Sequence, residues 1–492
     1  MAQGRGPARA QGPARRHGEG VVGDPIPEAG RSGERANPGG TARRRAIPRP
    51  DFRKAAAMTM SSALRERFDG LPSRGTATAV APTALAQNDI RVELADAARF
   101  GALAEAWTSL AARACVPNAF MDPAVALAVA EAWPYPVRVL LAWRDAEPGP
   151  APLLVGAWLF VERRTRQSWP YRALVCPPCS VAYLGTPVVD PDHARAVFAA
   201  IFATIREAPD LPKIVQVGDV SDDPLLMDAL RSALLDGAGA WTPIGRRRRA
   251  KLETRLDAKT YWANSMSAKH RHGFERMRRQ LAQQGKLEFV AVGQPAAVAV
   301  GIEEFLAMEA SGWKGARRSA LASDPATALF TRRMLQGLAE RGRVSVQSLR
   351  LDDVPIAILV VLYSGPGAFT WRVAYDERYR RYSPGILGLE NTTAHLLSDP
   401  AVASADSCNH MDVGYQAERW GERHEVIDFL IDLGSARPLR LAVLGRRERA
   451  FLRCKALARQ AYHAARRKRA ELTLKLRARL GHGPGPAAAP GA

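Results

Sequence analysis

The stretch from Phe369 to Gly414 constrains the fold of this chain most, because it reads as strand, glycine turn, helix and strand in succession. β-branched and aromatic residues fill Phe369–Tyr375, which predicts a strand. The turn Arg381–Gly385 follows, and Ile386–Leu397 has apolar residues at helical spacing, before a short predicted strand that ends at Gly414. A helix that begins just after a glycine turn exposes unpaired N–H groups, which suit a pyrophosphate. The alternative is that Ser-Pro-Gly only turns the chain and caps the helix.

Several further motifs occur in order along the chain. They are Phe100–Trp107, Phe120–Pro123, the basic segment Lys269–Gly285, Phe305–Gly315, Tyr382–Gly385, Asp412–Tyr415 and Trp420–Gly421. On these motifs, the span from about Arg91 to Leu433 resembles the CelD/BcsL-type acetyltransferases of the GNAT superfamily, which are related in fold to the Fem peptidoglycan transferases. The resemblance implies an α/β (α+β) fold of tandem GNAT-like domains. Each domain would be a mixed, mostly antiparallel sheet flanked by helices.

The resemblance also implies an acyl-CoA-dependent N- or O-acyltransferase. Its donor would be acetyl-CoA or another acyl-CoA, and its acceptor an amine or a sugar hydroxyl, with a polysaccharide or envelope precursor as one setting. The thioester is already activated, so the protein must hold the donor, polarise the thioester carbonyl through a strand N–H, and remove a proton. No metal is expected.

Nine residues are the candidates for these tasks. The residues expected to hold the acyl-CoA are Val373, Ala374, Arg381, Ser383, Gly385 and Ile386. Asp412 and Glu309 are the candidate bases, and Tyr415 is the candidate acid that protonates the departing thiolate. For each carboxylate, helix capping or a surface ion pair is the alternative interpretation.

The sequence departs from the family pattern in the phosphate loop and after the last Asp-x-Gly. Tyr382 and Leu387 occupy the flanking positions of the loop, and Gln416 stands where the family usually has a lysine. Two other functions therefore stay open. One is a Fem-like transferase that uses aminoacyl-tRNA, and the other is a non-catalytic exopolysaccharide assembly protein.

Composition predicts the domain organisation. Residues 1–85 form a basic tail that is expected to be disordered, because its Gly-, Pro- and Arg-rich start cannot offset the entropy of ordering. Translation from Met58 or Met60 is a further interpretation of this tail. An N-terminal GNAT-like domain is expected over 86–245, as a degenerate copy that forms one wall of the substrate cleft, and the acetyltransferase domain over 250–435. The run Arg246–Arg249 between them reads as a solvated linker, a basic helical extension covers 437–482, and 483–492 is expected to be disordered.

The net charge of +21 lies in the two ends of the chain. Residues 1–57 hold 12 Lys and Arg against 5 Asp and Glu, and residues 437–492 hold 15 against 2, so the core is close to neutral. Nucleic acid is therefore not expected as a partner of the core. The basic segment Ser267–Gln284 suits an acidic acceptor, the 3′-phosphate of coenzyme A, or tRNA, or is simply a solvated face. Residues 437–480 suit an anionic membrane surface, nucleic acid or an acidic protein.

Apolar runs and cysteines indicate the compartment. The longest apolar run, Ile356–Tyr363, is far shorter than the roughly 20 residues of a membrane helix. Five cysteines, an odd number, suit a reducing cytoplasm. Cys176-Pro-Pro-Cys179 has the spacing of a redox or zinc motif, but without a second pair it reads as a packed loop. The expected location is the cytoplasm, with peripheral contact at the inner membrane as the role of 437–480.

Overall fold

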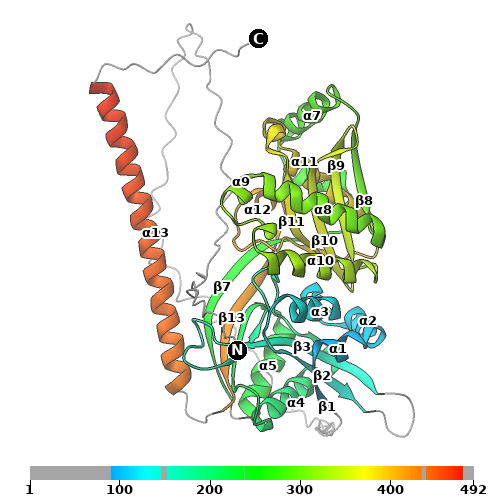
Figure 1. The fold of residues 1–492 in the computed structure, drawn as a ribbon, viewed down its shortest axis with the longest axis vertical. Coiled ribbons are helices and arrows are strands. Elements are labelled where there is room, and N and C mark those ends of the chain that lie inside the picture. The colour runs from blue at the N-terminus through cyan, green and yellow to red at the C-terminus, as the bar shows by residue number, and fades with distance from the viewer. Residues whose placement is uncertain (1–89, 146–151, 238, 435–438, 480–492) are drawn as a thin grey trace, which may run out of the picture. The chain divides into compact units, whose positions relative to one another are not determined.

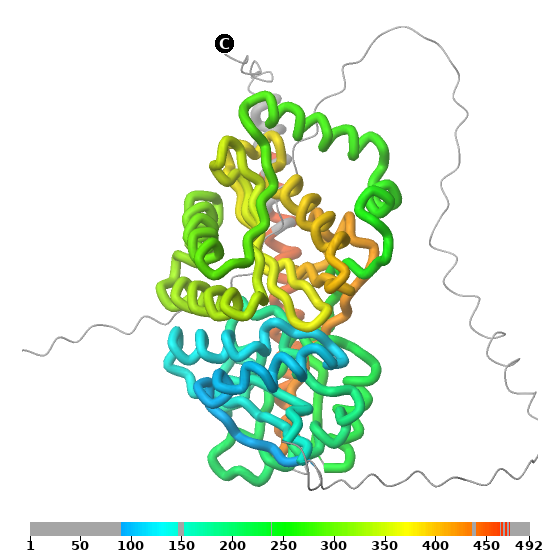
Figure 2. Tube along the Cα trace, turned by 90° about the vertical axis from the view of Figure 1, so that its right-hand side faces the viewer, coloured from blue at the N-terminus to red at the C-terminus, as the bar shows by residue number. Residues whose placement is uncertain are grey.

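The computed structural model describes residues 90–145, 152–237, 239–434 and 439–479. The tails expected to be disordered, 1–85 and 483–492, lie outside these ranges. Figure 2 traces the described chain from the blue start of its N-terminal half into the yellow part of its C-terminal half and back, in orange, to the first half. Its fold is mixed α/β, a large mixed sheet flanked by helices, as the sequence predicted.

The N-terminal half supplies seven strands and the helices that cover them. The strands are β1 (Ile90–Ala95), β2 (Val137–Arg144), β3 (Leu153–Arg163), β4 (Ala173–Cys176), β5 (Val188–Val189), β6 (Ile214–Ser221) and β7 (Ala240–Leu252). The helices are α1 (Ala97–Gly101), α2 (Ala104–Arg113), η1 (Ala119–Met121), α3 (Pro123–Ala132), η2 (Pro191–His193), α4 (Ala194–Glu207) and α5 (Pro224–Asp236).

The C-terminal half supplies six strands. They are β8 (Leu287–Val292), β9 (Val344–Leu351), β10 (Val354–Ser364), β11 (Gly367–Tyr375), β12 (Ser404–Asp406) and β13 (Glu422–Asp432). Its helices are α6 (Ala258–Ser265), α7 (Ala268–Ala282), α8 (Pro295–Ser311), α9 (Trp313–Ala316), η3 (Leu321–Ser323), α10 (Pro325–Ala339), η4 (Glu377–Tyr382), α11 (Pro384–Ser398), α12 (Tyr415–Arg419) and the C-terminal α13 (Leu439–Arg479).

Local sequence signals account for many of these boundaries. Asp122, Asp223 and Asp324 each precede a proline and accept a hydrogen bond from a backbone N–H of the first helical turn, so they start α3, α5 and α10. The hairpin of β9 and β10 turns at Asp352 and Asp353, whose φ angles of 48° and 64° are those of a tight two-residue turn.

The two halves exchange a strand at the centre of the sheet. The strand order is β1-β2-β3-β4-β6-β13-β7-β12-β11-β10-β9-β8, with β5 paired to β3. Strand β13 of the C-terminal half lies between β6 and β7, and β7 of the N-terminal half pairs with β12. Figure 1 shows β7 and β13 side by side. In each half two neighbouring strands are parallel, β4 with β6 and β11 with β12. The order therefore repeats about the β13–β7 pair, which fits two copies of one fold.

Helices cover both faces of the strands β9, β10 and β11. Helix α11 contacts all three strands on one face, and its core there includes Leu359, Val361 and Leu389. Helix α8 packs on the opposite face, where Ile358, Val360 and Phe305 belong to the main core. The face of α11 and the face of α8 thus have separate hydrophobic cores.

Two local predictions were wrong. The run Arg246–Arg249 is not a linker but the middle of β7, paired along its length with β13. The strand predicted to end at Gly414 is β12, which ends at Asp406, and Met411–Gly414 belong to an irregular segment before α12. Both errors concern strands whose partners are distant in sequence.

The basic C-terminal segment forms α13, whose first turns pack on the sheet. Leu441 and Leu444 are buried there, and Glu448 forms an ion pair with Arg166. Beyond Phe451, most of the side chains that the structure describes are exposed. None of the described helices is long and apolar enough to cross a membrane.

Candidate active site

Strands β11 and β12 separate in the middle of the sheet. They pair in parallel only from Gly367 to Phe369, whereas β11 continues to Tyr375. A bulge at Trp371 shifts the register between β11 and β10 just beyond this point. The edge of β11 that faced β12 therefore has no strand partner within the described chain, and its N–H groups are available to a ligand, whereas the Val373 carbonyl on this edge contacts Lys314.

A short polar chain lies where the two strands part. The Thr370 hydroxyl donates to the Asp406 carbonyl at 3.2 Å, and the Gln416 amide donates to the Thr370 hydroxyl at 2.8 Å. Gln416 replaces the family's lysine, and here it ties α12 to β11. The Gln416 side chain carries no charge, and its hydrogen bond to Thr370 is a structural contact.

The turn from η4 into α11 lies against the end of β11. Ser383 has a left-handed φ of 50°, Pro384 is the first helical residue, and Gly385 supplies the first N–H of α11 because proline has none. A Cβ at Gly385 would lie 3.2 Å from the Tyr375 ring, so the helix end and the strand end are in close contact. The structure thereby brings the end of β11, at Tyr375, against Gly385 at the start of α11.

The residues predicted to hold the acyl-CoA differ in their exposure and in the polar groups that are free to bind it. Val373 is 40% exposed and Ala374 is buried. Arg381 is exposed and stacks on the Tyr382 ring at 4.5 Å, with no ion pair to a described residue. The Ile386 N–H already donates to the Ser383 carbonyl at 2.9 Å. Gly385 and Arg381 are accordingly the two residues of this turn best placed to meet a phosphate.

Tyr382 and Leu387, the two residues that depart from the phosphate-loop pattern expected from the resemblance, belong to a hydrophobic core. Tyr382 is buried, and its hydroxyl accepts a hydrogen bond from the Gln284 amide at 2.7 Å. Leu387 is fully buried in the same cluster. They hold the turn against the end of α7 and leave the start of α11 intact.

Glu309, a predicted base, is buried at the end of α8. Its Oε1 accepts from the Lys314 ammonium at 2.7 Å, and its Oε2 accepts from the Leu321 N–H at 2.7 Å. Lys314 also reaches the Val373 carbonyl at 3.3 Å. Burial lowers the pKa of the Lys314 amine, and Glu309 opposes that shift. The Glu309–Lys314 pair therefore lies directly beside the unpaired edge of β11.

Tyr415, the predicted acid, is the first residue of α12. Its hydroxyl donates to Glu390 Oε1 at 3.0 Å, and Glu390 also binds Arg278 of α7 at 2.8 Å. Burial, reinforced by Glu390, raises the pKa of the Tyr415 hydroxyl well above its usual range. A hydroxyl in this state is a good hydrogen-bond donor and a weak proton donor.

Asp412, the other predicted base, lies in the irregular segment after β12. Its Oδ1 is 2.7 Å from Arg423 Nε, without the geometry of a hydrogen bond, and its Oδ2 is 3.8 Å from Arg248. The surroundings of Asp412 are those of an ion pair on β7 and β13. Its catalytic role stays a prediction.

Sequence reasoning missed three residues of this region: Lys314, Arg372 and Tyr183. Arg372 is a charged residue in the otherwise apolar β11, a signal that could have drawn attention to it. Tyr183 comes from the N-terminal half, and its ring lies 5.5 Å from both the Arg372 guanidinium and the His410 ring. No local pattern in the sequence indicates that contact.

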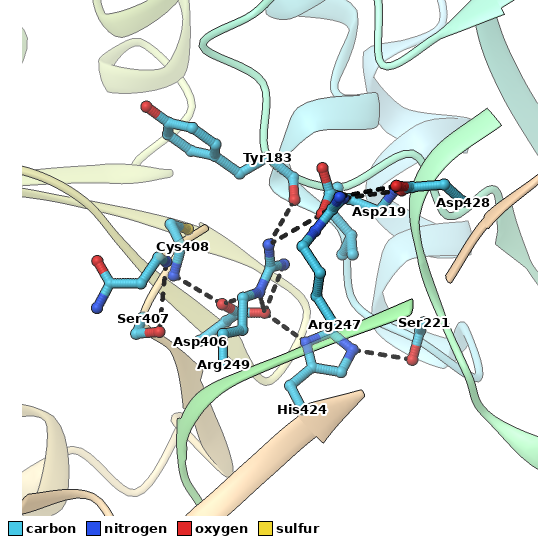
Figure 3. Close-up of polar contacts among 12 residues, drawn as sticks. Tyr183, Asp219, Ser221, Arg247, Arg249, Asp406, Ser407, Cys408, His424 and Asp428 are labelled. Carbon is cyan, nitrogen blue, oxygen red and sulfur yellow. Dashed lines mark hydrogen bonds and ion pairs between the residues drawn. The ribbon is translucent and has the colours of Figure 1, made fainter. Parts of the chain in front are cut away.

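A buried network of charges joins the two halves beside this region (Figure 3). Arg249 is 2% exposed; it donates to Asp406 at 2.8 and 3.0 Å and to the Tyr183 carbonyl at 2.7 Å. His424 bonds Asp406 through Nδ1 at 2.5 Å and Ser221 through Nε2 at 2.9 Å. Burial opposes ionisation of Asp406, but Arg249 and His424 outweigh it and hold the pKa of Asp406 below its usual range.

A second set in the same network is centred on Arg247. Its guanidinium donates to Asp219 at 2.7 Å and to both Asp428 oxygens at 2.7 and 2.8 Å. Arg247 is on β7, Asp219 is on β6 and Asp428 is on β13. The arginine run that resembled a linker thus holds the exchanged strands together.

In the N-terminal half, β4 and β6 correspond to β11 and β12, and a loop of the chain fills the space beside them. The Gly185 N–H donates to the Asp219 carbonyl at 3.2 Å, and the Gly185 carbonyl accepts from Trp158 at 3.2 Å. A Cβ at Gly185 would lie only 2.3 Å from the Gly218 carbonyl oxygen. Cys176 and Cys179 are buried free thiols at the start of this loop. The gap between β4 and β6 is therefore filled by the chain itself.

Three features of the C-terminal half suit an acyl-CoA. One strand edge is unpaired, the first N–H of α11 belongs to a glycine, and Arg381 is an exposed cation at the same turn. These features supply groups for a thioester carbonyl and for phosphates.

The match to a known family agrees with this geometry. Residues 268–420 match the family model described as acetyltransferase (GNAT) domain. Part of the C-terminal half is therefore similar to the GNAT acetyltransferase domain. This span includes η4, α11, Glu309 and Tyr415, and leaves out the N-terminal half and α13.

Other comparisons are more distant. No curated protein matches the chain. Among solved structures, FemX is 10% identical, with a TM-score of 0.49 over 72% of this chain and 100% of FemX. The C-terminal domain of a putative lysylphosphatidylglycerol synthetase from Agrobacterium fabrum is 13% identical, with a TM-score of 0.41 over 71% of this chain and 96% of that one. A tandem GNAT protein from the clavulanic acid biosynthesis pathway is 14% identical, with a TM-score of 0.37 over 70% and 99%.

Proposed function

We propose that this protein is an acyl-CoA-dependent acyltransferase whose donor site lies between β11 and the start of α11. The observation that carries the proposal is the separation of β11 from β12 beside the Pro384-Gly385 helix start. The match of residues 268–420 to the GNAT acetyltransferase domain supports acyl transfer as the reaction. Acetyl-CoA is the donor we propose to test first.

The donor supplies an acyl group that is already activated as a thioester. The backbone N–H of Val373, on the free edge of β11, would polarise the thioester carbonyl, whereas the N–H of Ala374, the next residue, points toward β10. The Gly385 N–H and the Arg381 guanidinium would bind the phosphates. The loop that fills the N-terminal half's own gap leaves the C-terminal half as the single proposed donor site.

Proton transfer is assigned to the residues beside the same strand edge. Glu309 with Lys314 is the pair that would accept the acceptor's proton, because Lys314 contacts the Val373 carbonyl. Tyr415 would donate a hydrogen bond to the departing sulfur once its hydroxyl turns away from Glu390 Oε1. Its raised pKa disfavours full proton release. Asp412 remains the alternative base. An amine or sugar hydroxyl of an envelope precursor is the acceptor class that the CelD/BcsL resemblance suggests.

Calorimetry of the full-length protein with acetyl-CoA tests the donor site. Gly385→Glu should abolish binding, because it puts a carboxylate where phosphate would sit and a Cβ 3.2 Å from Tyr375. The variant should still fold, since a carboxylate at a helix N-terminus is favourable by roughly 0.3–1 kcal/mol. Gly293→Glu, in the loop before α8, is the matched control and should bind normally. If the wild-type protein does not bind acetyl-CoA, or Gly385→Glu binds as well as wild type, the proposed donor site is wrong.

A further inference from the structure

One arginine beside the proposed donor site makes no side-chain hydrogen bond to the described chain. Arg372 is on β11 with its side chain 19% exposed, and its Nε–H is buried without an acceptor. The nearest carboxylate oxygen, Glu309 Oε1, is 4.0 Å from Nη1. By contrast, Arg247 and Arg249 each donate three hydrogen bonds. A mostly buried guanidinium with unused donors is costly unless a ligand or water accepts them.

No group that the structure describes around Arg372 accepts a hydrogen bond from its buried Nε–H. Glu309 already accepts from Lys314 and from the Leu321 N–H, so two cations share one carboxylate. The Tyr183 and Trp371 rings lie 5.5 and 5.9 Å from the guanidinium and fix its position without accepting a planar hydrogen bond. The carboxylates of the neighbouring network, Asp219, Asp406 and Asp428, are taken by Arg247 and Arg249.

The side chain of Arg372 points away from the proposed phosphate site. Beyond the bulge, Ala374 belongs to the core on the α8 face, as does Phe305, whereas Tyr375 packs with the core on the α11 face. Arg372, two residues before Ala374, lies on the α8 face with Glu309 and Lys314. The phosphates of the donor would lie at α11, so an anion at Arg372 would belong to a different molecule.

We propose that Arg372, with Lys314 as a second cation, binds an anionic group of the acyl acceptor, a carboxylate or a phosphate. The planar guanidinium can donate two parallel hydrogen bonds to either group. Such an anion would also relieve the repulsion between the Arg372 and Lys314 charges. The assignment of the anion to the acceptor rests on the proposed function, whereas the anion site itself does not.

Calorimetric titration of the full-length protein with malonate and with inorganic phosphate, at constant ionic strength in chloride, tests the site. The wild-type protein should bind at least one anion, and the tighter of the two shows whether the group is a carboxylate or a phosphate. Arg372→Gln should weaken that binding roughly tenfold to a hundredfold, the range for a hydrogen bond to a charged group. Arg332→Gln, an exposed arginine of α10 paired with Glu303, is the matched control and should bind as wild type does.

The outcomes separate this inference from the donor site. Anion binding that Arg372→Gln leaves unchanged, or no binding of either anion by the wild type, would overturn the anion site. Acetyl-CoA binding should persist in Arg372→Gln, which also reports that the variant is folded. If acetyl-CoA does not bind but the anions bind at Arg372, the proposed donor site fails while the anion site stands. If anions and acetyl-CoA exclude each other, the anion site is part of the donor site and the assignment to the acceptor is wrong.

Discussion

Two neighbouring arginines of β7 should differ sharply in their contribution to stability. Arg249 is 2% exposed and donates three hydrogen bonds, two of them to Asp406, whereas Arg248 is 60% exposed and lies 3.8 Å from Asp412. Replacing Arg249 with Met leaves a buried carboxylate without its cation. Removing one partner of a buried ion pair costs roughly 3–5 kcal/mol. His424 and the Cys408 N–H still contact Asp406, so we expect the lower end of that range, about 3 kcal/mol.

The matched variant Arg248→Met should cost at most about 1 kcal/mol, as is usual for an exposed ion pair. Urea unfolding followed by circular dichroism measures both, and the transition midpoints should separate clearly if the slopes are alike. Both substitutions remove one positive charge from the same strand, so the change in net charge cancels in the comparison. If Arg249→Met unfolds within about 1 kcal/mol of the wild type, the buried network does not hold the exchanged strands as inferred.

Three further variants test other parts of the structure. Because the folded pKa of Asp406 is depressed, the stability that Asp406 contributes is present above the unfolded pKa of about 3.9 and is lost as the pH falls through the folded pKa. Asp406→Asn should therefore flatten the pH dependence of the urea midpoint below about pH 4. An unchanged slope would contradict this. Gly185→Ala should destabilise the protein by roughly 1–3 kcal/mol, because the new Cβ would lie 2.3 Å from the Gly218 carbonyl oxygen. The control Gly421→Ala, whose Cβ would have no atom within 4 Å, should cost under about 0.5 kcal/mol. Equal shifts of the two variants in thermal melts would argue against a tightly filled loop. Removing residues 456–492 leaves the packing of Leu441 and Leu444 intact. If α13 binds an anionic membrane surface, this truncation should abolish sedimentation with phosphatidylglycerol vesicles. Binding that persists after the truncation would show that the proposal is wrong.

Local signals in the sequence predicted a large part of the C-terminal half. The strand over Phe369–Tyr375, the turn Arg381–Gly385 and the helix that follows it all depend on a few adjacent residues, and the structure has each of them. The fold class followed from motif order rather than from any single residue. Such features depend on backbone preferences that act over one turn of chain.

Pairing between distant segments was beyond reach of the same reasoning. Arg246–Arg249 looked solvated because four adjacent charges usually are, and the carboxylates that pair with Arg247 and Arg249 come from β6, β12 and β13. Glu309 was identified as a candidate, but its partner Lys314 lies across the break between α8 and α9, and Arg372 becomes notable only when its missing hydrogen bonds are visible. The contact of Tyr183 with Arg372 joins residues from different halves.

The exchanged strand also bears on how the chain is made. The partner that β6 needs is β13, and Asp432 pairs with Ile214 across most of the described chain. Until the ribosome has released β13, the nascent N-terminal half has an open sheet edge at β6, where backbone groups invite wrong partners. Contacts this far apart in sequence form slowly. The sheet of the first half is therefore completed only when the last strand of the second half has been made.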